Sequence, residues 1–206
     1  MPIEKFLWSR TGDGVLIRKP CVTVTAFIKS LPQSVRLAAK MTCPMPEFLI
    51  RAANPDDAPA LSALIQFTLR TTNVKNYVPE VIEKVCTHFT PEQIHRKLAE
   101  REIFIGFWEA EMAGTVSFAG NRVYALYVLP AYQGQGIGAR LIEHIEKRAM
   151  DGGLEELWLS SSLTARGFYE KCGYQMQNFE DWGDGDMTLL MRKSLSAGEP
   201  LKTPAG

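Results

Sequence analysis

The sequence predicts an α+β domain built on a mixed, mostly antiparallel central sheet that is flanked by helices. Two observations lead to this fold class. Apolar runs of strand length alternate with stretches that have helical spacing and helix start signals. Three strand-like runs follow one another in the middle of the chain and two more follow near its end, so the order is not the strict alternation of a parallel sheet.

The composition limits the classes of function. The chain has 206 residues, of which 46% are hydrophobic and 22% charged, and this suffices for one globular domain with appendages. Its formal net charge of zero argues against nucleic acid as the main partner. No run approaches the ~18 to 20 apolar residues that a membrane span needs, so we expect no integral membrane segment.

Cysteine and histidine usage predicts neither a metal site nor a disulfide framework. The four cysteines and three histidines lack C-x-x-C and paired-histidine spacing: Cys21, Cys43, Cys86, Cys172, His88, His95 and His144. Free thiols are typical of a reducing compartment, so we expect a cytoplasmic protein.

The first part of the chain differs in charge from the rest. Up to Cys43 it holds seven basic and two acidic residues, whereas the remainder holds 16 basic and 21 acidic ones. Residues 1–44 are therefore predicted to be a basic leader that is poorly ordered or dispensable. It can be a transit peptide, a disordered arm, or an extension upstream of a start at Met41 or Met45. Residues 45–195 form the single domain, and residues 196–206 a frayed tail.

The domain is predicted to begin with a strand and a helix. Residues 48–53 (FLIRAA) are a short apolar run. Residues 54–70 form a helix, because Pro59 lies in its first turn, where proline is tolerated, and apolar residues recur with helical spacing. The residues of this apolar stripe are Leu61, Leu64, Ile65 and Leu69.

A loop and a second helix are expected next. Residues 71–85 are polar and aromatic and are predicted to be a loop with a helical turn or two. Within residues 87–98, Thr90 is a good N-cap and Pro91 suits the first helical position, so a helix begins there.

The middle of the chain is predicted to be a three-stranded meander. Residues 103–118 form a hairpin, since two apolar-aromatic runs are separated by the polar stretch Glu109–Glu111. Residues 122–129 form the next strand, which ends at Pro130 because the residue before a proline favours extended geometry.

The remaining elements are a helix, a strand, a helix and a strand pair. The helix covers residues 136–150 and ends before two glycines. Residues 156–162 are a strand, and residues 164–174 hold a helix that ends at a glycine. Residues 174–182 and 186–195 form the final strand pair.

The segment LYVLPAYQGQGIGARL, residues 126–141, carries the strongest functional signal. It is not a P-loop, because no Lys-Ser/Thr pair follows the last glycine. The dinucleotide motif G-x-G-x-x-G is disfavoured, because the glycines are spaced G-x-G-x-G and three strands precede them. A glycine turn at a helix N-terminus still offers free N–H groups to a pyrophosphate. The preceding strand can pair with an extended amide-bearing arm, and coenzyme A has both parts.

Two motifs in this sequence resemble those of a known family. V-x-P-x-Y-Q-x-Q-G-I-G-x-R-L, Val128 to Leu141, is similar to the acyl-CoA-binding signature of the GNAT superfamily of N-acetyltransferases. SSLTARGFYEKCGY, Ser161 to Tyr174, is similar to that family's S-x-x-A-x-x-F-Y-x-x-x-G-[FY] segment. The resemblance covers roughly Phe48 to Leu195 with the elements in the right order. It implies a GNAT-like fold with a splayed strand pair at the coenzyme A site.

The resemblance also implies roles for particular residues. Leu126, Tyr127 and Val128 match the strand that pairs with pantetheine and polarises the thioester carbonyl. Tyr169 matches the tyrosine that protonates the departing thiolate, and Ser162 stands where many members have an asparagine that contacts the coenzyme A arm. Arg140 adds a charge contact. The pyrophosphate loop, acting through backbone amides, corresponds to Gln133, Gly134, Gln135, Gly136, Ile137, Gly138 and Ala139.

The expected function is transfer of an acetyl group from acetyl-CoA, as cosubstrate and without a metal, to a primary amine by direct attack. The acceptor, a small molecule or a peptide, is not specified by the sequence, and the protein is expected to be a monomer or a homodimer. The alternative is a non-catalytic module that binds or senses acyl-CoA. This alternative stays open because neither RVYALYVL nor LWLSSS contains a carboxylate that could act as general base.

Three features leave the acceptor side open. Tyr124 or an ordered water can relay the proton of the amine in place of a carboxylate. Tyr77 and His88 fall where the family's acceptor pocket forms, although a structural role is equally compatible with the sequence. An acidic cluster between the last two strands is favoured as a solvated loop over a site for a cationic acceptor. Its residues are Glu180, Asp181, Asp184 and Asp186.

Overall fold

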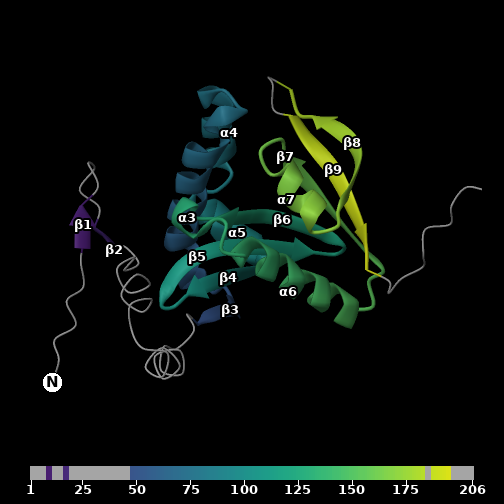
Figure 1. Ribbon diagram of the computed structural model, residues 1–206, viewed down its shortest axis with the longest axis horizontal. Helices are drawn as coiled ribbons and strands as arrows, with labels where there is room; N and C mark the ends of the chain where they lie inside the picture. Colours follow the sequence, from purple (N-terminus) through teal and green to yellow (C-terminus); the bar gives the residue numbers. More distant parts are fainter. Residues whose placement is uncertain (1–7, 11–15, 19–46, 184–186, 196–206) are drawn as a thin grey trace, which may run out of the picture. The chain divides into compact units, whose positions relative to one another are not determined.

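The structure, a computed structural model, describes residues 8–10, 16–18, 47–183 and 187–195 (Figure 1). The chain divides into two compact units, residues 1–45 and 46–206. In the first unit, β1 (Trp8–Arg10) and β2 (Leu16–Arg18) pair in antiparallel orientation. The rest of the predicted leader and the predicted tail 196–206 lie outside the described residues.

The second unit contains a seven-stranded mixed sheet with the order β3-β4-β5-β6-β7-β9-β8. All neighbouring strands are antiparallel except β6 and β7, which are parallel. This confirms the predicted α+β class and its mostly antiparallel sheet. The strands are β3 (Phe48–Ala52), β4 (Glu102–Trp108), β5 (Glu111–Ala119), β6 (Arg122–Val128), β7 (Glu156–Ser162), β8 (Gln175–Asp181) and β9 (Met187–Ser194).

Helices cover both faces of this sheet. They are α3 (Ala58–Thr72), α4 (Pro79–Thr87), α5 (Pro91–Glu100), α6 (Ile137–Asp151) and α7 (Arg166–Lys171), with the 3-10 turns η1 (Pro55–Asp57), η2 (Asn73–Lys75) and η3 (Pro130–Tyr132). Two core clusters result, and β4 contributes to both because successive side chains alternate between its faces. Phe104 packs in the cluster of α6 and α7, which we call the α6 face. Ile103 and Ile105 pack in the cluster of α3 to α5, the α3 face.

Residues 71–85, predicted to be a loop with a helical turn or two, contain more helix than expected, because α3 runs to Thr72 and α4 forms a nine-residue helix from Pro79. Val78 is extended and Pro79 occupies the first helical position, which is a regular helix start. Val81, Ile82 and Cys86 then recur with helical spacing and are buried. The apolar stripe is short, and polar residues on both sides masked it in the sequence.

A partly buried ion pair joins α6 to the C-terminal strands. The Nζ atom of Lys193 lies 2.7 and 2.8 Å from the two carboxylate oxygens of Glu146. The two side chains are 26% and 12% exposed, respectively. Removing one partner leaves the other charge partly buried without compensation, which is costly.

We expect Lys193→Met to lower the free energy of unfolding by about 2 kcal/mol, less than for a fully buried pair because water still reaches the lysine. The matched control is Arg166→Met, which breaks the exposed pair with Glu170 on α7 and should cost at most about 0.5 kcal/mol. Urea denaturation of both variants measures the difference. Equal losses of unfolding free energy in the two variants would show that the Lys193–Glu146 pair stabilises the fold no more than an exposed pair does.

Candidate active site

The parallel strands β6 and β7 form a fork. They are in register at only two residue pairs, Arg122 with Trp158 and Val123 with Leu159. Beyond these pairs the two strands no longer bond to each other, and β7 rises steeply away from β6 (Figure 1). The backbone groups that face the gap are therefore open to a ligand that lies along a strand edge. This is the splayed strand pair that the resemblance implies.

A bulge in β6 lies just inside the fork. Ala125 has a φ of +49°, which is unusual for a residue other than glycine, and the register with β5 shifts at the same place. The bulge changes which side chains face which core. Val123 and, after the bulge, Leu126 and Val128 pack on the α6 face, whereas Tyr127 packs on the α3 face. The extra residue thus redirects the peptide groups of the half of β6 that borders the fork.

A glycine turn connects β6 to α6. Gly134 and Gly136 have φ values of +76° and +81°, which side chains rarely adopt. No side chain caps the helix start at Ile137, so its first N–H groups retain their capacity to bind an anion. A methyl group built on either glycine would meet no atom within 4 Å. The outer side of the turn is therefore open.

The glutamines of the turn are used to hold it in shape. The side-chain amide of Gln133 donates to the carbonyl of Val128 at 2.9 Å, and that of Gln135 donates to the carbonyl of Ala131 at 3.0 Å. Each side-chain amide keeps a second N–H and its carbonyl oxygen, whereas the backbone N–H of Gln133 donates to the carbonyl of Pro130 at 3.3 Å. This is compatible with the predicted role of the loop, which stays a prediction.

The other loop residues serve the packing of α6. A Cβ on Gly138 would lie 3.1 Å from the ring of Phe168, so this glycine lets α6 and α7 approach each other. Ile137 is fully buried, and Ala139 is half-buried on the first helical turn. The guanidinium carbon of Arg140 lies 4.4 Å from the ring centroid of Phe48 on β3. The predicted charge contact of Arg140 with coenzyme A stays untested.

Tyr169 lies on α7 and is 7% exposed. Its ring packs edge-on against Phe168 at 5.1 Å and Tyr174 at 5.8 Å between centroids. Burial raises the pKa of Tyr169 above its usual range, so the phenol carries its proton at neutral pH. Ser162 accepts a hydrogen bond at 3.2 Å from the N–H of Ala165 and so shapes the turn that leads into α7.

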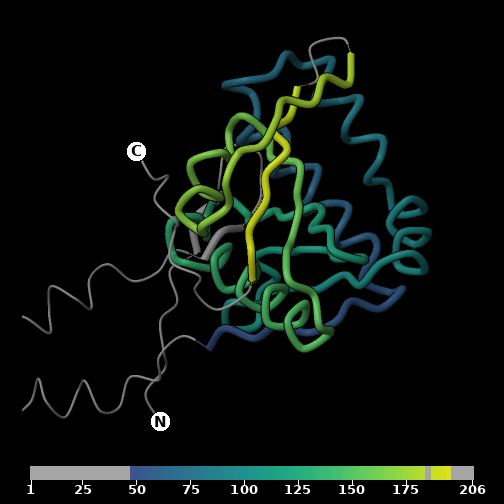
Figure 2. The backbone as a smooth tube through the Cα atoms, turned by 90° about the vertical axis from the view of Figure 1, so that its right-hand side faces the viewer, coloured from purple at the N-terminus to yellow at the C-terminus, as the bar shows by residue number. Residues whose placement is uncertain are grey.

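The connection between α3 and α4 is hydrogen-bonded to the C-terminal end of β7 and the N-terminal end of β9. The hydroxyl of Tyr77 accepts from the N–H of Leu163 at 2.9 Å and donates to the carbonyl of Met187 at 2.7 Å. Figure 2 shows both segments at the same end of the domain. Tyr77 therefore bridges the α3 side and the β7–β9 side of the fork, whereas His88 is exposed at the end of α4.

Sequence reasoning missed Arg122 on β6. Its guanidinium binds Ser160 on β7 and Glu180 on β8, and so links three strands on the α3 face. An arginine at the start of a predicted strand carries no signal of such a role, because its partners are 38 and 58 residues away. Of the predicted acidic cluster, Glu180 has these partners and Asp181 is exposed, while Asp184 and Asp186 lie outside the described residues.

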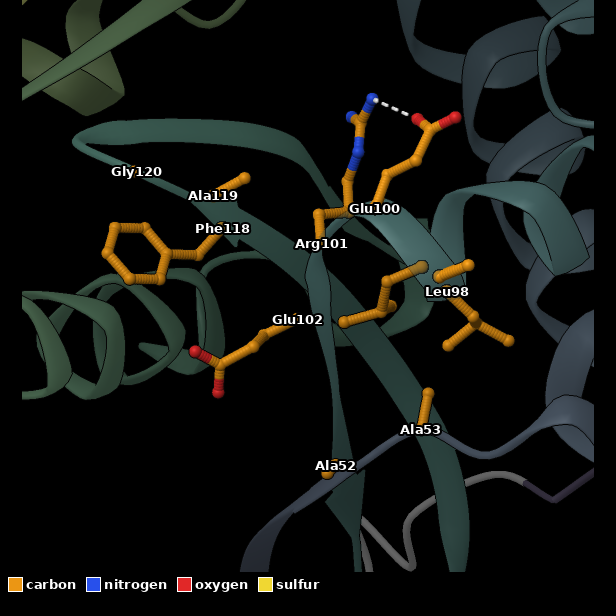
Figure 3. Close-up of a pocket in the computed structure, with 11 residues that line it drawn as sticks. Ala52, Ala53, Leu98, Glu100, Arg101, Glu102, Phe118, Ala119 and Gly120 are labelled. Atoms are coloured by element: carbon orange, nitrogen blue, oxygen red, sulfur yellow. Dashed lines mark ion pairs between the residues drawn. The ribbon is translucent and has the colours of Figure 1, made fainter.

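A hollow of about 500 Å³ lies away from the fork (Figure 3). It is lined by the ends of β3 and β5 and the start of β4, with Ala52, Ala53 and Gly120 on its wall. The only ion pair drawn there joins Glu100 and Arg101 at 3.9 Å. The glycine turn follows the opposite end of the meander, since Val128 pairs with Gly114 near the start of β5. This hollow offers little catalytic chemistry, and the fork is the stronger candidate.

The mixed sheet with its forked parallel pair and the glycine turn before α6 make this a GNAT-type fold. A family model described as an acetyltransferase (GNAT) domain matches residues 73–195, which is more than half of the chain. The chain therefore belongs to the GNAT acetyltransferases.

Curated relatives carry the same kind of name. The uncharacterized N-acetyltransferase YafP of Escherichia coli is 23% identical over 130 residues, which cover 52% of this chain and 83% of YafP. The S-alkylcysteine N-acetyltransferase of Bacillus subtilis is 32% identical over 79 residues, 35% of this chain. The matched region spans only 44% of that enzyme's length.

Solved structures share the fold. A GCN5-related N-acetyltransferase from Rhodopseudomonas palustris matches with a TM-score of 0.67 and 24% identity, over 75% of this chain and 98% of that one. The PaiA N-acetyltransferase from Thermoplasma acidophilum, in complex with coenzyme A, matches with a TM-score of 0.61 and 21% identity. This match covers 72% of this chain and 99% of that one. YncA from Salmonella typhimurium, with its cofactor acetyl-CoA, also matches. Its TM-score is 0.51 and its identity 16%, and the match covers 75% of this chain and 97% of that one.

Among the described residues, no group of three His, Cys, Asp or Glu side chains is arranged to hold a metal ion. No helix in the described part of the chain is long and apolar enough to cross a membrane.

Proposed function

We propose that this protein transfers the acetyl group of acetyl-CoA to a primary amine by direct attack, without a covalent enzyme intermediate. The observation that carries the proposal is the placement of two features at one end of β6. The strand edge is open on the side of the fork, and the glycine turn with its free N–H groups follows directly. The solved relatives that hold coenzyme A or acetyl-CoA support the choice of cosubstrate.

In this proposal the two parts of acetyl-CoA are held by different elements. The backbone N–H groups from Gly134 to Ala139 bind the pyrophosphate, whose negative charge is favoured at the positive end of the α6 dipole, and Arg140 adds a charge contact. The free edge of β6 at Leu126–Val128 pairs with the amides of the pantetheine arm. A backbone N–H next to the bulge stabilises the oxyanion that develops on the thioester carbonyl.

The chemistry then requires three proton transfers. The ammonium of the acceptor loses one proton, and the nitrogen lone pair forms a bond to the carbonyl carbon. The C–S bond breaks, the sulfur keeps the electron pair, and the phenol of Tyr169 protonates the thiolate. The tyrosinate recovers a proton from the amide nitrogen through solvent. The products are the N-acetylated amine and free coenzyme A, with one proton released overall.

Calorimetric titration and a thiol-release assay test the proposal. We expect saturable binding of acetyl-CoA at sub-millimolar concentration, and thiol release with at least one amine of a diverse panel. The panel contains S-methyl-L-cysteine, L-lysine, a dipeptide with a free N-terminus, spermidine and an aminoglycoside. S-Methylcysteine is included because of the similarity to the S-alkylcysteine enzyme. Absence of saturable binding would refute the proposal.

A second candidate function is a non-catalytic module that binds acyl-CoA. The fork itself supports it, because β6 carries no carboxylate and the carboxylate of β7, on Glu156, is already occupied. Its oxygens accept from Trp158 at 2.7 Å and pair with Arg192 at 2.7 Å. This candidate predicts binding of acetyl-CoA without thiol release for every amine of the panel.

A further inference from the structure

A carboxylate is held beside the point where the fork opens. Ser160 is the first residue of β7 beyond its last pair with β6, and it is exposed. One nitrogen of Arg122, Nη2, lies 2.6 Å from the hydroxyl of Ser160 and 3.3 Å from Oε1 of Glu180. Because both contacts share one atom, the Glu180 carboxylate lies next to the point where β7 leaves β6, although β9 separates the backbones of β7 and β8.

Glu180 lies on the opposite face of the sheet from Tyr169. Leu159 and Leu189 pack in the cluster of the α6 face that also contains Tyr169. Side chains alternate along strands, so Ser160 and Thr188 point to the α3 face, and Glu180 pairs with Thr188 in register. Glu180 therefore faces the α3 side of the fork near its closed end, and Tyr169 lies on the other face of the sheet.

The carboxylate is oriented but not saturated. Its Oε1 accepts from Arg122, and its Oε2 accepts from the hydroxyl of Thr188 at 3.1 Å. The Thr188 hydroxyl in turn accepts from the indole N–H of Trp182 at 2.9 Å. An ionised carboxylate has about four acceptor positions, so these contacts leave about two free. The side chain is 21% exposed, so water or a ligand reaches it. Arg122 already supplies one positive charge 3.3 Å from Oε1, so an ammonium group would bind at the free positions of Oε2.

We propose that Glu180 receives the ammonium group of the acceptor and takes its first proton, acting as the general base that β6 and β7 lack. The proton moves from nitrogen to a carboxylate oxygen, directly or through one water. The neutral nitrogen then attacks the thioester carbon, and Glu180 returns the proton to solvent when the product leaves. The proposal rests on the proposed function, because it assigns a role within the same transfer.

Glu180→Gln tests this role, since it removes the charge and keeps the size and the contact with Arg122. With the panel amine that gives the fastest thiol release in the unmodified protein, we expect kcat/KM at pH 7 to fall at least tenfold. The dissociation constant of acetyl-CoA should stay within twofold. The loss of kcat/KM relative to the unmodified protein should become smaller as the pH approaches the pKa of the amine. A larger fraction of the amine is then already neutral in solution and needs no general base. Glu180→Asp should restore part of the activity.

The control is Asp181→Asn, the same charge change at the next residue, which is exposed and points to the other face of β8. It should leave kcat/KM unchanged. A Glu180→Gln variant as active as the unmodified protein, or a deficit independent of pH, would overturn the assignment while leaving the proposed function intact. Absence of thiol release from the unmodified protein with every amine would instead contradict the proposed function, and with it the role of Glu180.

Discussion

Tyr169→Phe is expected to lower kcat by about 100-fold or more, because general acid catalysis typically contributes 10²- to 10⁴-fold. The dissociation constant of acetyl-CoA should change by less than twofold, since the ring that packs between Phe168 and Tyr174 is retained. Stopped-flow thiol release and calorimetry measure the two quantities on the same preparation. The loss should appear in the chemical step and not in binding.

The protonation state of Tyr169 supports this expectation. Burial raises its pKa, so the phenol is protonated and ready to donate at any physiological pH. Burial also raises the pKa of the Cys172 thiol on the same helix end. A coenzyme A sulfur buried in the same region would be affected in the same direction. Burial also makes the phenol a weaker acid, so proton donation by Tyr169 requires that the proton affinity of the departing thiolate is raised as well.

The matched control is Tyr174→Phe, because Tyr174 packs against Tyr169 and is also buried. Its buried hydroxyl interacts with the Glu146 carboxylate but forms no well-aligned hydrogen bond, so its removal should cost little stability. We expect unchanged kcat and nearly unchanged stability. Equal losses in the two variants would show that the pair of rings, and not a proton from Tyr169, is what catalysis requires.

Gly136→Ala is expected to raise the dissociation constant of acetyl-CoA by about tenfold or more and to destabilise the fold by about 1–2 kcal/mol. Gly136 has a φ of +81° at the position directly before α6, and an alanine there is strained even though the space is open. Relief of the strain would move the N–H groups of the turn away from the positions in which they converge on an anion. Calorimetry and urea denaturation measure the two effects.

Gly167→Ala is the control for this substitution. Gly167 lies in α7, its φ is not in the left-handed region, and a Cβ there would meet no atom within 4 Å. Alanine should stabilise the helix by up to about 1 kcal/mol and leave acetyl-CoA binding unchanged. A similar affinity in the two variants would contradict a role of the Gly136 conformation in binding.

Much of the fold could be predicted because local patterns in this chain agree with the tertiary structure. Pro91 after Thr90 marks the start of α5, and Pro130 marks the end of β6. The length of α4 was underestimated because its stripe of Val81, Ile82 and Cys86 is only two turns long. The bulge at Ala125 was not predictable, since its sequence continues a regular strand pattern and the shift arises from pairing with β5.

The candidate site could be predicted where it depends on backbone and not where it depends on long-range contacts. Glycines at alternate positions indicate a turn with open N–H groups, and the structure has left-handed glycines at Gly134 and Gly136. The third, Gly138, has a different role, because its neighbour Phe168 comes from a helix that the spacing alone does not bring near. The contacts of Tyr77 and Arg122 join residues that are distant in sequence, and no local pattern encodes them.

The two register pairs between β6 and β7 also have a consequence for the cooperativity of the domain. Direct hydrogen bonding between the half-sheet β3–β6 and the half-sheet β7–β9 is confined to this short seam. The C-terminal half should therefore open locally at a lower free energy than the meander does, and its amides should exchange with deuterium sooner. A ligand that bonds to the free edge of β6 and fills the fork would link the halves. Slower exchange in β7, β8 and β9 would then report occupancy of the site without any turnover.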